Sequence, residues 1–259
     1  MLVSILLPIR FYSPQVSSSV ESLLCQTYSN FELVVILNDA DAKVVEIIHK
    51  YSDLRMRVLE KTNLRNLSEA LNYGAKHCKG AWIFRADADD IYSRDRLITQ
   101  LHFASQFAFD ITLLGMTSDK TVEVEKGGLK RIQVEDLLFS NPIVHSSVMI
   151  KREFLLQNPY DVNYKFSQDY ELWTRAVKKG CVIVTDKKIV KVDGSVRSGK
   201  YVLEQEYFFL KANLKFIVDN LLKNRGCRTT FITLRALRHS LARCFNLLRN
   251  TMRYKIGRW

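Results

Sequence analysis

The sequence has no apolar run close to the roughly 18 consecutive residues that a membrane-spanning helix needs. Its N-terminal stretch, MLVSILLPIRFYS, has no basic region before the apolar residues, and Pro8 and Arg10 interrupt them. A secretory signal peptide has a basic start and an unbroken apolar centre. We therefore expect a buried first strand here, in a cytoplasmic protein.

Cysteine is scarce and scattered. The chain has five cysteines, an odd number, and none of them forms a C-x-x-C pair. This spacing excludes a disulfide framework and a thiolate zinc site. We expect reduced thiols at Cys25, Cys78, Cys181, Cys227 and Cys244.

Acidic residues are absent from the last part of the chain. Residues 225–259 hold nine of the 39 Lys and Arg residues and none of the 27 Asp and Glu residues. The first 224 residues, with 30 basic and 27 acidic side chains, are nearly balanced, so the net charge of +12 lies mainly in the tail. An anionic partner is therefore expected to bind the tail. The sequence pI of about 9.5 allows a nucleic-acid-binding protein as an alternative. The balanced body and the absence of a nucleic-acid motif argue against it.

The first hundred residues alternate between apolar runs and helical patterns. Runs 3–9 and 31–37 are continuous and rich in β-branched residues, as in parallel strands covered on both faces. Between them lies a helical pattern for which Ser13 is a plausible N-cap and Pro14 the first helical residue. The alternation continues with helix 41–52, strand 55–60, helix 66–78 and strand 81–86. This order predicts an α/β protein with a doubly wound, mostly parallel sheet.

The alternation is less regular in the second hundred residues. We expect a helix at 94–107, a strand at 111–116, a polar loop or hairpin at 117–130, a strand at 144–152, a helix at 167–179 and a strand at 181–186. From about residue 200 the pattern is helical to the end.

Three acids follow the predicted strand 81–86, namely Asp87, Asp89 and Asp90. In open α/β sheets ligands bind beyond the carboxyl ends of the strands. Carboxylates spaced as D-x-D can direct oxygens to one Mg²⁺ or Mn²⁺, whose charge would cancel their repulsion. The alternative is a solvated loop in which Asp90 or Ser93 caps the helix that begins near Arg94.

Four blocks of the sequence together resemble glycosyltransferase family 2, which has the GT-A fold. They are ESLLCQTYSNFELVVILND (21–39), NLRNLSEALNYGAKHCKGAWIFRADADDIYSRDRLITQL (63–101), NPIVHSSVMIKREFL (141–155) and YDVNYKFSQDYELWTRAVKKG (160–180). The blocks stand in the family's order, and the resemblance extends over about residues 3–195.

The resemblance implies a divalent cation, Mn²⁺ or Mg²⁺, that bridges the two phosphates of a nucleotide sugar. Asp89 is the first candidate ligand, and Asp87 would share the cation or contact the ribose. Asp193 stands where the family often has a metal-binding histidine, and its oxygen donors offer a weaker candidate. Arg197 and Lys200, in a loop with Gly194 and Gly199, would alternatively hold the phosphates.

The resemblance also implies that Asp169 is the general base. The family pattern at this point is Glu-Asp, and Gln168 replaces the Glu in this chain. Loss of a neighbouring acid removes a like-charge repulsion, so Asp169 is no harder to keep ionised. His145 matches a family histidine in the acceptor half, although a lone histidine is commonly a hydrogen-bonded structural residue.

Residues after the first and second strands are expected to line the nucleoside pocket. Pro8 to Arg10 follow the first strand, and Asn38 or Asp39 would hold the edge of the base. Arg65 would approach the diphosphate, or it is a surface arginine.

The tail has an apolar stripe at helical spacing beside a basic face. The stripe is formed by Leu234, Leu237, Leu241, Phe245, Leu248 and Met252, and the basic residues are Arg235, Arg238, Arg243, Arg249 and Arg253. This pattern is typical of a helix that lies on an anionic leaflet, although the stripe could instead pack on the rest of the protein.

The sequence thus predicts a GT-A domain at 1–200, with a nucleotide-sugar half at 1–100 and an acceptor half at 101–200. A helical basic extension would occupy 201–259. The expected activity is inverting transfer of a sugar from a nucleotide sugar, for which we expect a UDP-linked donor, to a saccharide acceptor. The expected setting is lipid-linked polysaccharide or O-antigen assembly at the inner face of the cytoplasmic membrane. The alternative is a catalytically silent relative that only binds a nucleotide sugar, suggested by Gln168 and Asp193.

Overall fold

The computed structural model describes residues 1–117, 119, 124, 128–138, 140–192 and 199–223, together with positions 235, 238 and 242. The predicted ligand Asp193, the predicted phosphate clamp Arg197 and the side chain of Lys200 lie outside the described residues. So do the apolar stripe of the tail and most of the predicted loop 117–130.

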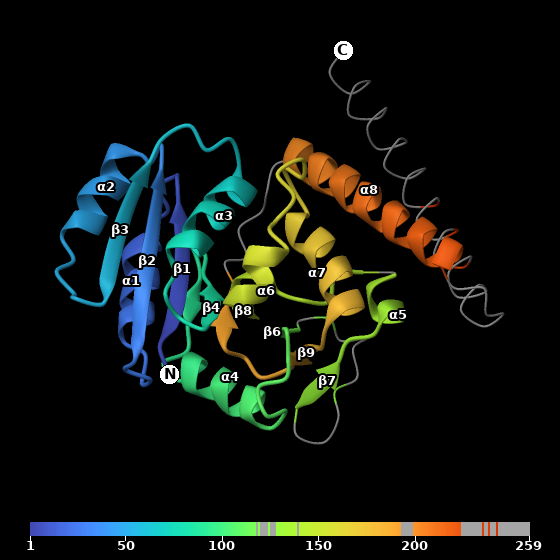
Figure 1. The fold of residues 1–259 in the computed structure, drawn as a ribbon. Helices are drawn as coiled ribbons and strands as arrows, with labels where there is room; N and C mark the ends of the chain where they lie inside the picture. Colours follow the sequence, from blue (N-terminus) through green and yellow to red (C-terminus); the bar gives the residue numbers. More distant parts are fainter. Residues whose placement is uncertain are drawn as a thin grey trace, which may run out of the picture.

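One sheet of eight strands runs through both halves of the chain, in the order β3-β2-β1-β4-β8-β6-β9-β7. Its first four strands are parallel to one another. They alternate with helices along the chain, as Figure 1 shows. The elements of this half are β1 (Val3–Ile9), α1 (Val16–Leu24), β2 (Phe31–Asn38), α2 (Ala42–His49), β3 (Met56–Lys61), α3 (Leu67–His77) and β4 (Trp82–Arg85).

The second half of the sheet is mixed. Strand β8 is antiparallel to both β4 and β6, β9 is parallel to β6, and β7 is antiparallel to β9. The elements are β5 (Ile91–Tyr92), α4 (Arg96–Ser105), β6 (Leu113–Met116), β7 (Leu129–Arg131), α5 (Val134–Leu137), the 3₁₀ turn η1 (His145–Ser147), β8 (Met149–Lys151), α6 (Arg152–Gln157), α7 (Gln168–Lys179), β9 (Val182–Thr185), β10 (Val190–Lys191) and α8 (Gly199–Lys223).

Helices cover both faces of the sheet. Side chains of α1, α2 and α4 pack in one buried cluster with one set of strand residues. Side chains of α3 and α5–α8 pack in a second cluster with the alternate set. Because successive strand residues point to opposite faces, strands buried on both sides are apolar throughout. The predicted doubly wound α/β architecture with a C-terminal helix is confirmed.

Three local predictions were wrong. The N-cap of α1 is Gln15 and not Ser13, because a turn of Pro14 and Gln15 precedes the helix. The N-cap of α4 is Asp95, rather than Asp90 or Ser93. The predicted strand 144–152 is a 3₁₀ turn, a strand of three residues and the start of α6. An apolar run does not reveal where backbone bonding changes from a turn to a sheet.

The sequence predicted neither disulfide bonds nor a membrane-spanning helix, and the described residues bear on both predictions. Among these residues, Cys25, Cys78 and Cys181 are free thiols. No helix within the described part of the chain is both long enough and apolar enough to span a membrane.

Candidate active site

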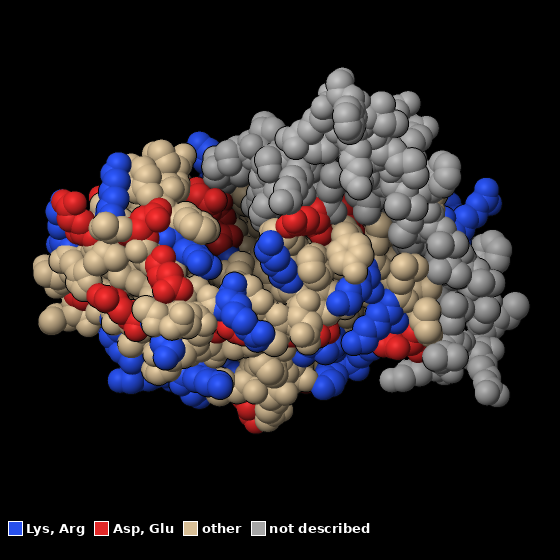
Figure 2. All heavy atoms as spheres, turned by 90° about the horizontal axis from the view of Figure 1, so that it is seen from above, with Lys and Arg blue, Asp and Glu red and all other residues tan. Residues whose placement is uncertain are grey.

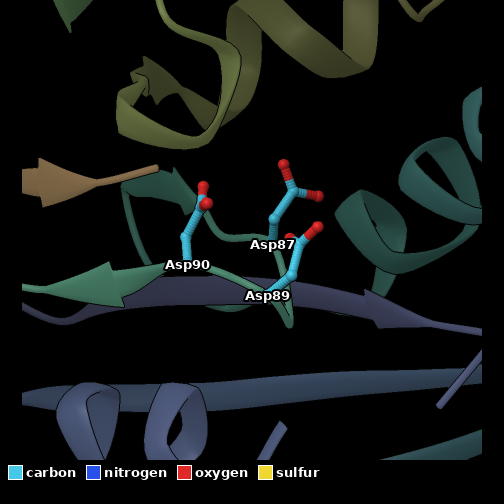
Figure 3. A group of neighbouring side chains, drawn as sticks. All are labelled: Asp87, Asp89 and Asp90. Carbon is cyan, nitrogen blue, oxygen red and sulfur yellow. The ribbon is translucent and has the colours of Figure 1, made fainter. Parts of the chain in front are cut away.

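The three acids lie in the loop between β4 and β5, with carboxylate oxygens within 4.8 Å of one another. Figure 3 shows the side chains of Asp87, Asp89 and Asp90 rising to the same side of this loop, away from the strands beneath it. Asp90 is buried, and the other two are half-buried. The sequence prediction that these acids converge is therefore supported by their geometry.

The backbone of Asp87 is fixed from two elements. The Tyr92 hydroxyl accepts a hydrogen bond from the Asp87 N–H (2.6 Å) and donates one to the Asp87 carbonyl (3.0 Å). Ser19 on α1 donates to the same carbonyl (3.0 Å). Tyr92 lies on β5, which pairs with Val190 and Lys191 of β10. This pairing brings residues 190–192 beside the acidic loop.

Arg85, at the end of β4, lies beneath the acids. It is 2% exposed, and its Nη1 forms an ion pair with Asp87 Oδ2. Residues 83, 85 and 87 alternate with Phe84, so Arg85 points to the face that α7 covers. Burial alone would lower the pKa of Arg85, but the adjacent Asp87 carboxylate holds that pKa above its usual value. Arg85 is therefore a permanent cation in the wall of the site.

A second buried guanidinium lies on the other side of the sheet. Arg96 is fully buried, and it donates to the Arg85 carbonyl (2.8 Å) and to Gln100 Oε1 (3.1 Å). Its guanidinium carbon is 4.8 Å from the centre of the Tyr92 ring. Burial lowers the pKa of Arg96 to about 10, so it stays protonated at neutral pH. This cation ties the end of β4 to α4.

A pocket of about 400 Å³ joins the acids to the second half of the chain. Figure 2 shows a hollow on this face, with acidic side chains inside it and basic ones along its rim. The pocket is lined by Leu67, Arg85, Asp87, Asp89, Asp90, Val144, His145, Ser146, Lys165, Phe166, Ser167, Gln168, Asp169, Val192 and Gln205.

The predicted general base, Asp169, lies in this pocket in the first turn of α7. Its Oδ2 accepts a hydrogen bond from Asn141 Nδ2 (2.9 Å). Burial raises the pKa of Asp169 above its usual value, although hydrogen bonds from the Tyr170 N–H and from Asn141, and the charge of Arg85, oppose that rise. A half-buried carboxylate with a raised pKa accepts a proton more readily than an ordinary aspartate.

The turn before Asp169 is held in an unusual conformation. Ser167 has a φ of 54°, in the left-handed region that few residues other than glycine adopt. Its Oγ donates to the carbonyl of Gln205 on α8 (3.2 Å). Gln168, the departure from the family pattern, is 6% exposed and lines the same pocket. Helix α8 thus contributes to the position of the base.

His145 lines the pocket as part of a packed aromatic group. Its Nε2 is 3.0 Å from the Tyr160 hydroxyl, and its ring meets those of Tyr160 and Trp173 edge-on, at 5.7 and 5.9 Å between centres. Burial, and then the charge of Arg85, lower the pKa of His145 well below its usual value. His145 is therefore neutral at physiological pH and has the contacts of a structural residue.

The predicted nucleoside residues lie at or just beyond the carboxyl ends of β1 and β2, outside the lining of this pocket. Pro8 lies opposite Ile36 in the parallel pair, and Arg10 is exposed just beyond β1. Asn38 is 4% exposed, and its Nδ2 donates to the Leu64 carbonyl (3.0 Å). Its buried Oδ1 has no hydrogen-bond partner among the described residues.

Asp39 and Arg65 each have a partner of their own. Asp39 has a φ of 44°, and its Oδ2 accepts from the Asn63 N–H (3.1 Å). Arg65 is exposed and forms an ion pair with Glu69, with its Nε 2.5 Å from Glu69 Oε1. This geometry fits the alternative of a surface arginine, unless Arg65 leaves Glu69 when a diphosphate binds.

The acidic loop fits a hard divalent cation. It offers carboxylate oxygens from three residues at a mutual spacing that one ion can bridge, and all three open into the pocket. Mg²⁺ and Mn²⁺ prefer such oxygen ligands and commonly share them with substrate phosphates. Asp87 and Asp89 therefore remain the candidate ligands, and Asp90 joins them.

The sequence prediction missed Arg85, Tyr92 and Asn141. Arg85 had a detectable signal, because it is a charged residue inside an apolar strand and shares a strand face with Asp87. Tyr92 and Asn141 had none. Asn141 is 28 residues from the side chain that it contacts, so only the fold brings the two together.

Comparisons of the sequence identify related proteins. The model of the family described as "Glycosyl transferase family 2" matches residues 4–191. The O-antigen biosynthesis glycosyltransferase WbnJ of Escherichia coli is 30% identical over 188 residues, which covers 69% of this chain and 72% of that protein. The UDP-Glc:alpha-D-GlcNAc-diphosphoundecaprenol beta-1,3-glucosyltransferase WfgD of E. coli is 26% identical over 206 residues, covering 79% and 78%.

Solved structures share the fold at low sequence identity. S. aureus TarS 1-349 in complex with UDP-GlcNAc matches with a TM-score of 0.67 and 18% identity, over 95% of this chain and 73% of that one. The mannosyltransferase PcManGT from Pyrobaculum calidifontis, in complex with GDP-Man and Mn²⁺, matches with a TM-score of 0.67 and 16% identity, over 93% and 73%. The predicted GT-A fold is confirmed.

The clamp on the acidic loop leads to a prediction about stability. Tyr92→Phe removes both hydrogen bonds to Asp87 and leaves the N–H of this half-buried residue without its acceptor. We expect the free energy of unfolding to fall by about 1–3 kcal/mol in urea denaturation. Tyr207→Phe, at a residue that is 57% exposed, is the matched control and should change little. If the two substitutions lowered the free energy of unfolding equally, the hydrogen bonds of Tyr92 to the Asp87 backbone would not stabilise the loop.

Proposed function

The chain belongs to glycosyltransferase family 2 and is a glycosyltransferase, and from this premise we propose that it is an inverting, metal-dependent enzyme. It transfers a sugar from a nucleotide sugar to a saccharide acceptor. The observation that carries the proposal is the shared pocket, in which the three acids after β4 lie together with the carboxylate of Asp169. A cation site and a separate base are the two features that such a transfer requires.

The acids and Asp169 have different tasks in this reaction. Asp87 and Asp89 would hold the divalent cation that accompanies the donor diphosphate, and Asp90 would support them. When bound, the cation offsets the negative charge that develops on the leaving nucleoside diphosphate. Asp169 accepts the proton of the acceptor hydroxyl, whose oxygen attacks the anomeric carbon from the side opposite the diphosphate. A single in-line displacement inverts the configuration.

The surroundings of Asp169 suit a base that works near neutral pH. Burial raises its proton affinity, while the amide of Asn141 orients Oδ2 and keeps the carboxylate ionised. Arg85 lowers the pKa of the same group from within the pocket wall. Gln168 brings no second charge next to the base, so its presence is compatible with catalysis.

The donor nucleotide in this proposal is a uridine diphosphate sugar. Asn38 ends β2 with a buried Oδ1 that lacks a hydrogen-bond partner among the described residues. This carbonyl oxygen can accept the N3–H of uracil once the groups that cover it move on donor binding. Pro8 and Arg10 border the same strand ends, and Asp39 lies next in the chain. TarS is known in complex with UDP-GlcNAc, and WfgD is named for a UDP-Glc donor.

The acceptor in this proposal is a lipid-linked saccharide of a cell-surface polysaccharide. WfgD is named for an acceptor on diphosphoundecaprenol, and WbnJ for O-antigen biosynthesis. An enzyme that works on such acceptors needs access to the inner face of the cytoplasmic membrane. The arginine-rich tail of this chain supplies that contact. In this proposal the glycosyltransferase domain is residues 1–200, and the basic extension that contains the tail is residues 201–259.

Replacement of the base separates binding from chemistry. Asp169→Asn keeps the shape and the hydrogen bond to residue 141 but removes the proton acceptor. We expect the UDP-sugar Kd to stay the same and kcat to fall by about 10²–10⁴-fold. Asp110→Asn, at an exposed acid outside the pocket, is the control and should retain full activity. Full transfer activity in the Asp169 variant would remove Asp169 from the mechanism.

The raised pKa of Asp169 predicts the direction of two further results, the pH dependence of kcat/KM in the wild type and the stability of Asp169→Asn. In the wild type, kcat/KM should fall as the pH drops through a pKa above 3.8, because the base becomes protonated. A raised pKa also means that ionised Asp169 destabilises the fold, at a cost that grows as the pH rises from 3.8 through the folded-state pKa. Asp169→Asn should therefore be at least as stable as the wild type at pH 7.

The cation ligands are tested through nucleotide binding. Asp89→Ala should abolish the strengthening of UDP binding by Mn²⁺, because it removes a carboxylate from the cation site. In calorimetry, the ratio of the UDP affinities with and without Mn²⁺ should be smaller in this variant than in the wild type by a factor of about ten or more. Asp95→Ala removes an exposed acid of the same segment that does not line the pocket, and it should keep the effect. A wild type whose UDP affinity ignores both Mn²⁺ and Mg²⁺ would refute metal dependence.

Membrane contact is tested by the charge of the tail. In the full chain, Gln in place of Arg235, Arg238, Arg243, Arg249 and Arg253 should reduce flotation with vesicles that contain phosphatidylglycerol. Each basic residue near an anionic surface contributes about 1 kcal/mol, so the loss should be nearly complete. Neutral phosphatidylcholine vesicles are the control. Equal flotation of both proteins with anionic vesicles would defeat the proposal.

A further inference from the structure

We propose that Arg85 acts as a resident counter-cation of the acidic loop, which disfavours binding of a bare divalent cation and favours binding of the nucleoside diphosphate. This inference rests on the proposed function, because it concerns the order in which the two ligands enter the same site. Arg85 pairs with Asp87 and acts on the two ligands through its charge, so it is not a catalytic residue.

The geometry makes Arg85 part of the site rather than of the core alone. Its Nη1 pairs with Asp87 Oδ2, and the side chain is 3% exposed where it borders the pocket. Its Nε has no hydrogen-bond partner among the described residues. The strand positions the guanidinium, since Phe84 of β4 pairs with Met149 of β8 and Arg85 follows directly. The charge cannot leave by rotation into solvent, and it cannot be removed by deprotonation.

The charge of Arg85 has opposite effects on the two ligands. A divalent cation bound to Asp87 lies next to the guanidinium, and the two positive charges repel each other. A nucleoside diphosphate carries about three negative charges and is repelled by the three acids, and the guanidinium reduces that repulsion. The Arg85 side chain is almost fully buried, so solvent screens its interactions weakly.

The affinity of the site for a cation and a nucleotide together, a pair with little net charge, should depend little on Arg85. The complex of a divalent cation with a nucleoside diphosphate carries only about one negative charge, so the repulsive and attractive contributions of Arg85 nearly cancel. The wild-type site therefore discriminates against the free cation and accepts the cation together with the nucleotide. This sign pattern differs from that of a residue that only supports the fold, because loss of such a residue weakens every ligand.

Two substitutions separate the charge of Arg85 from its hydrogen bond. Arg85→Gln is neutral and keeps an N–H donor for Asp87, whereas Arg85→Lys keeps the charge. Arg85→Met is a second neutral variant whose side chain suits a buried strand. Lys165→Gln removes a positive charge from the same pocket, at a side chain that is 63% exposed and paired with Glu204, and it is the matched control.

The experiment measures three affinities in the full chain. Free Mn²⁺ is titrated by electron paramagnetic resonance without nucleotide, UDP by calorimetry in EDTA, and UDP by calorimetry at saturating Mn²⁺. For Arg85→Gln or Arg85→Met we expect Mn²⁺ alone to bind at least about tenfold more tightly and UDP alone at least about tenfold more weakly. UDP at saturating Mn²⁺ should lose affinity in these two variants by about the factor that Mn²⁺ gains, so that the affinity for the cation and nucleotide together changes little. Arg85→Lys and Lys165→Gln should stay within about threefold of the wild type in all three.

The outcomes distinguish this inference from the proposed function. If the neutral variants bind both Mn²⁺ and UDP more weakly, or neither differently, Arg85 is structural and the inference is overturned. A thermal unfolding scan shows whether the neutral variants bind weakly because they have lost the fold. In that case Arg85→Lys is the deciding variant. If it does not keep both affinities near those of the wild type, the inference is overturned. If the wild type binds neither Mn²⁺ nor UDP, the proposed cation site itself fails, and the inference fails with it.

Discussion

The structure depends on how negative charge is accommodated at the end of β4. Three carboxylates lie within 4.8 Å of one another, which is unfavourable without nearby positive charge. The fold supplies that charge from beneath, through the ion pair of Arg85 and Asp87 and through Arg96 across the sheet. Buried cations are themselves costly unless they are paired. The acids and the arginines therefore stabilise each other, and neither set is easily replaced alone.

This charge arrangement also explains the second half of the pocket. Arg85 points to the face covered by α7, where His145 and Asp169 lie. Burial lowers the pKa of the half-buried His145, and the same positive charge lowers it further. Burial raises the pKa of Asp169, and this charge opposes the rise. One guanidinium thus influences both the acidic loop and Asp169, although the acids follow β4 and Asp169 lies in the first turn of α7. The two halves of the chain form a single electrostatic unit.

The sequence predicted the parts of the fold that depend on local patterns. Strand 3–9 and helix 167–179 agree with β1 and α7 because their apolar spacing reflects burial. The strand predicted at 144–152 failed because the turn at His145–Ser147 is set by hydrogen bonds that an apolar run does not encode. The acids and Asp169 were candidates through family motifs. Asn141 and Tyr92 were not, since their roles arise only from contacts across the fold.

The position of the pocket at the junction of β4 and β8 follows from the change in sheet direction. Strands β1 to β4 are parallel, so their carboxyl ends and the loops after them gather at one edge. Strand β8 runs antiparallel to β4, so the turn η1 that precedes it reaches the same edge and brings His145 beside the acids. A wholly parallel sheet would place the residues before β8 at the opposite edge. The antiparallel strand is therefore the step in the topology that brings the turn before β8 to the acidic loop at the ends of the parallel strands.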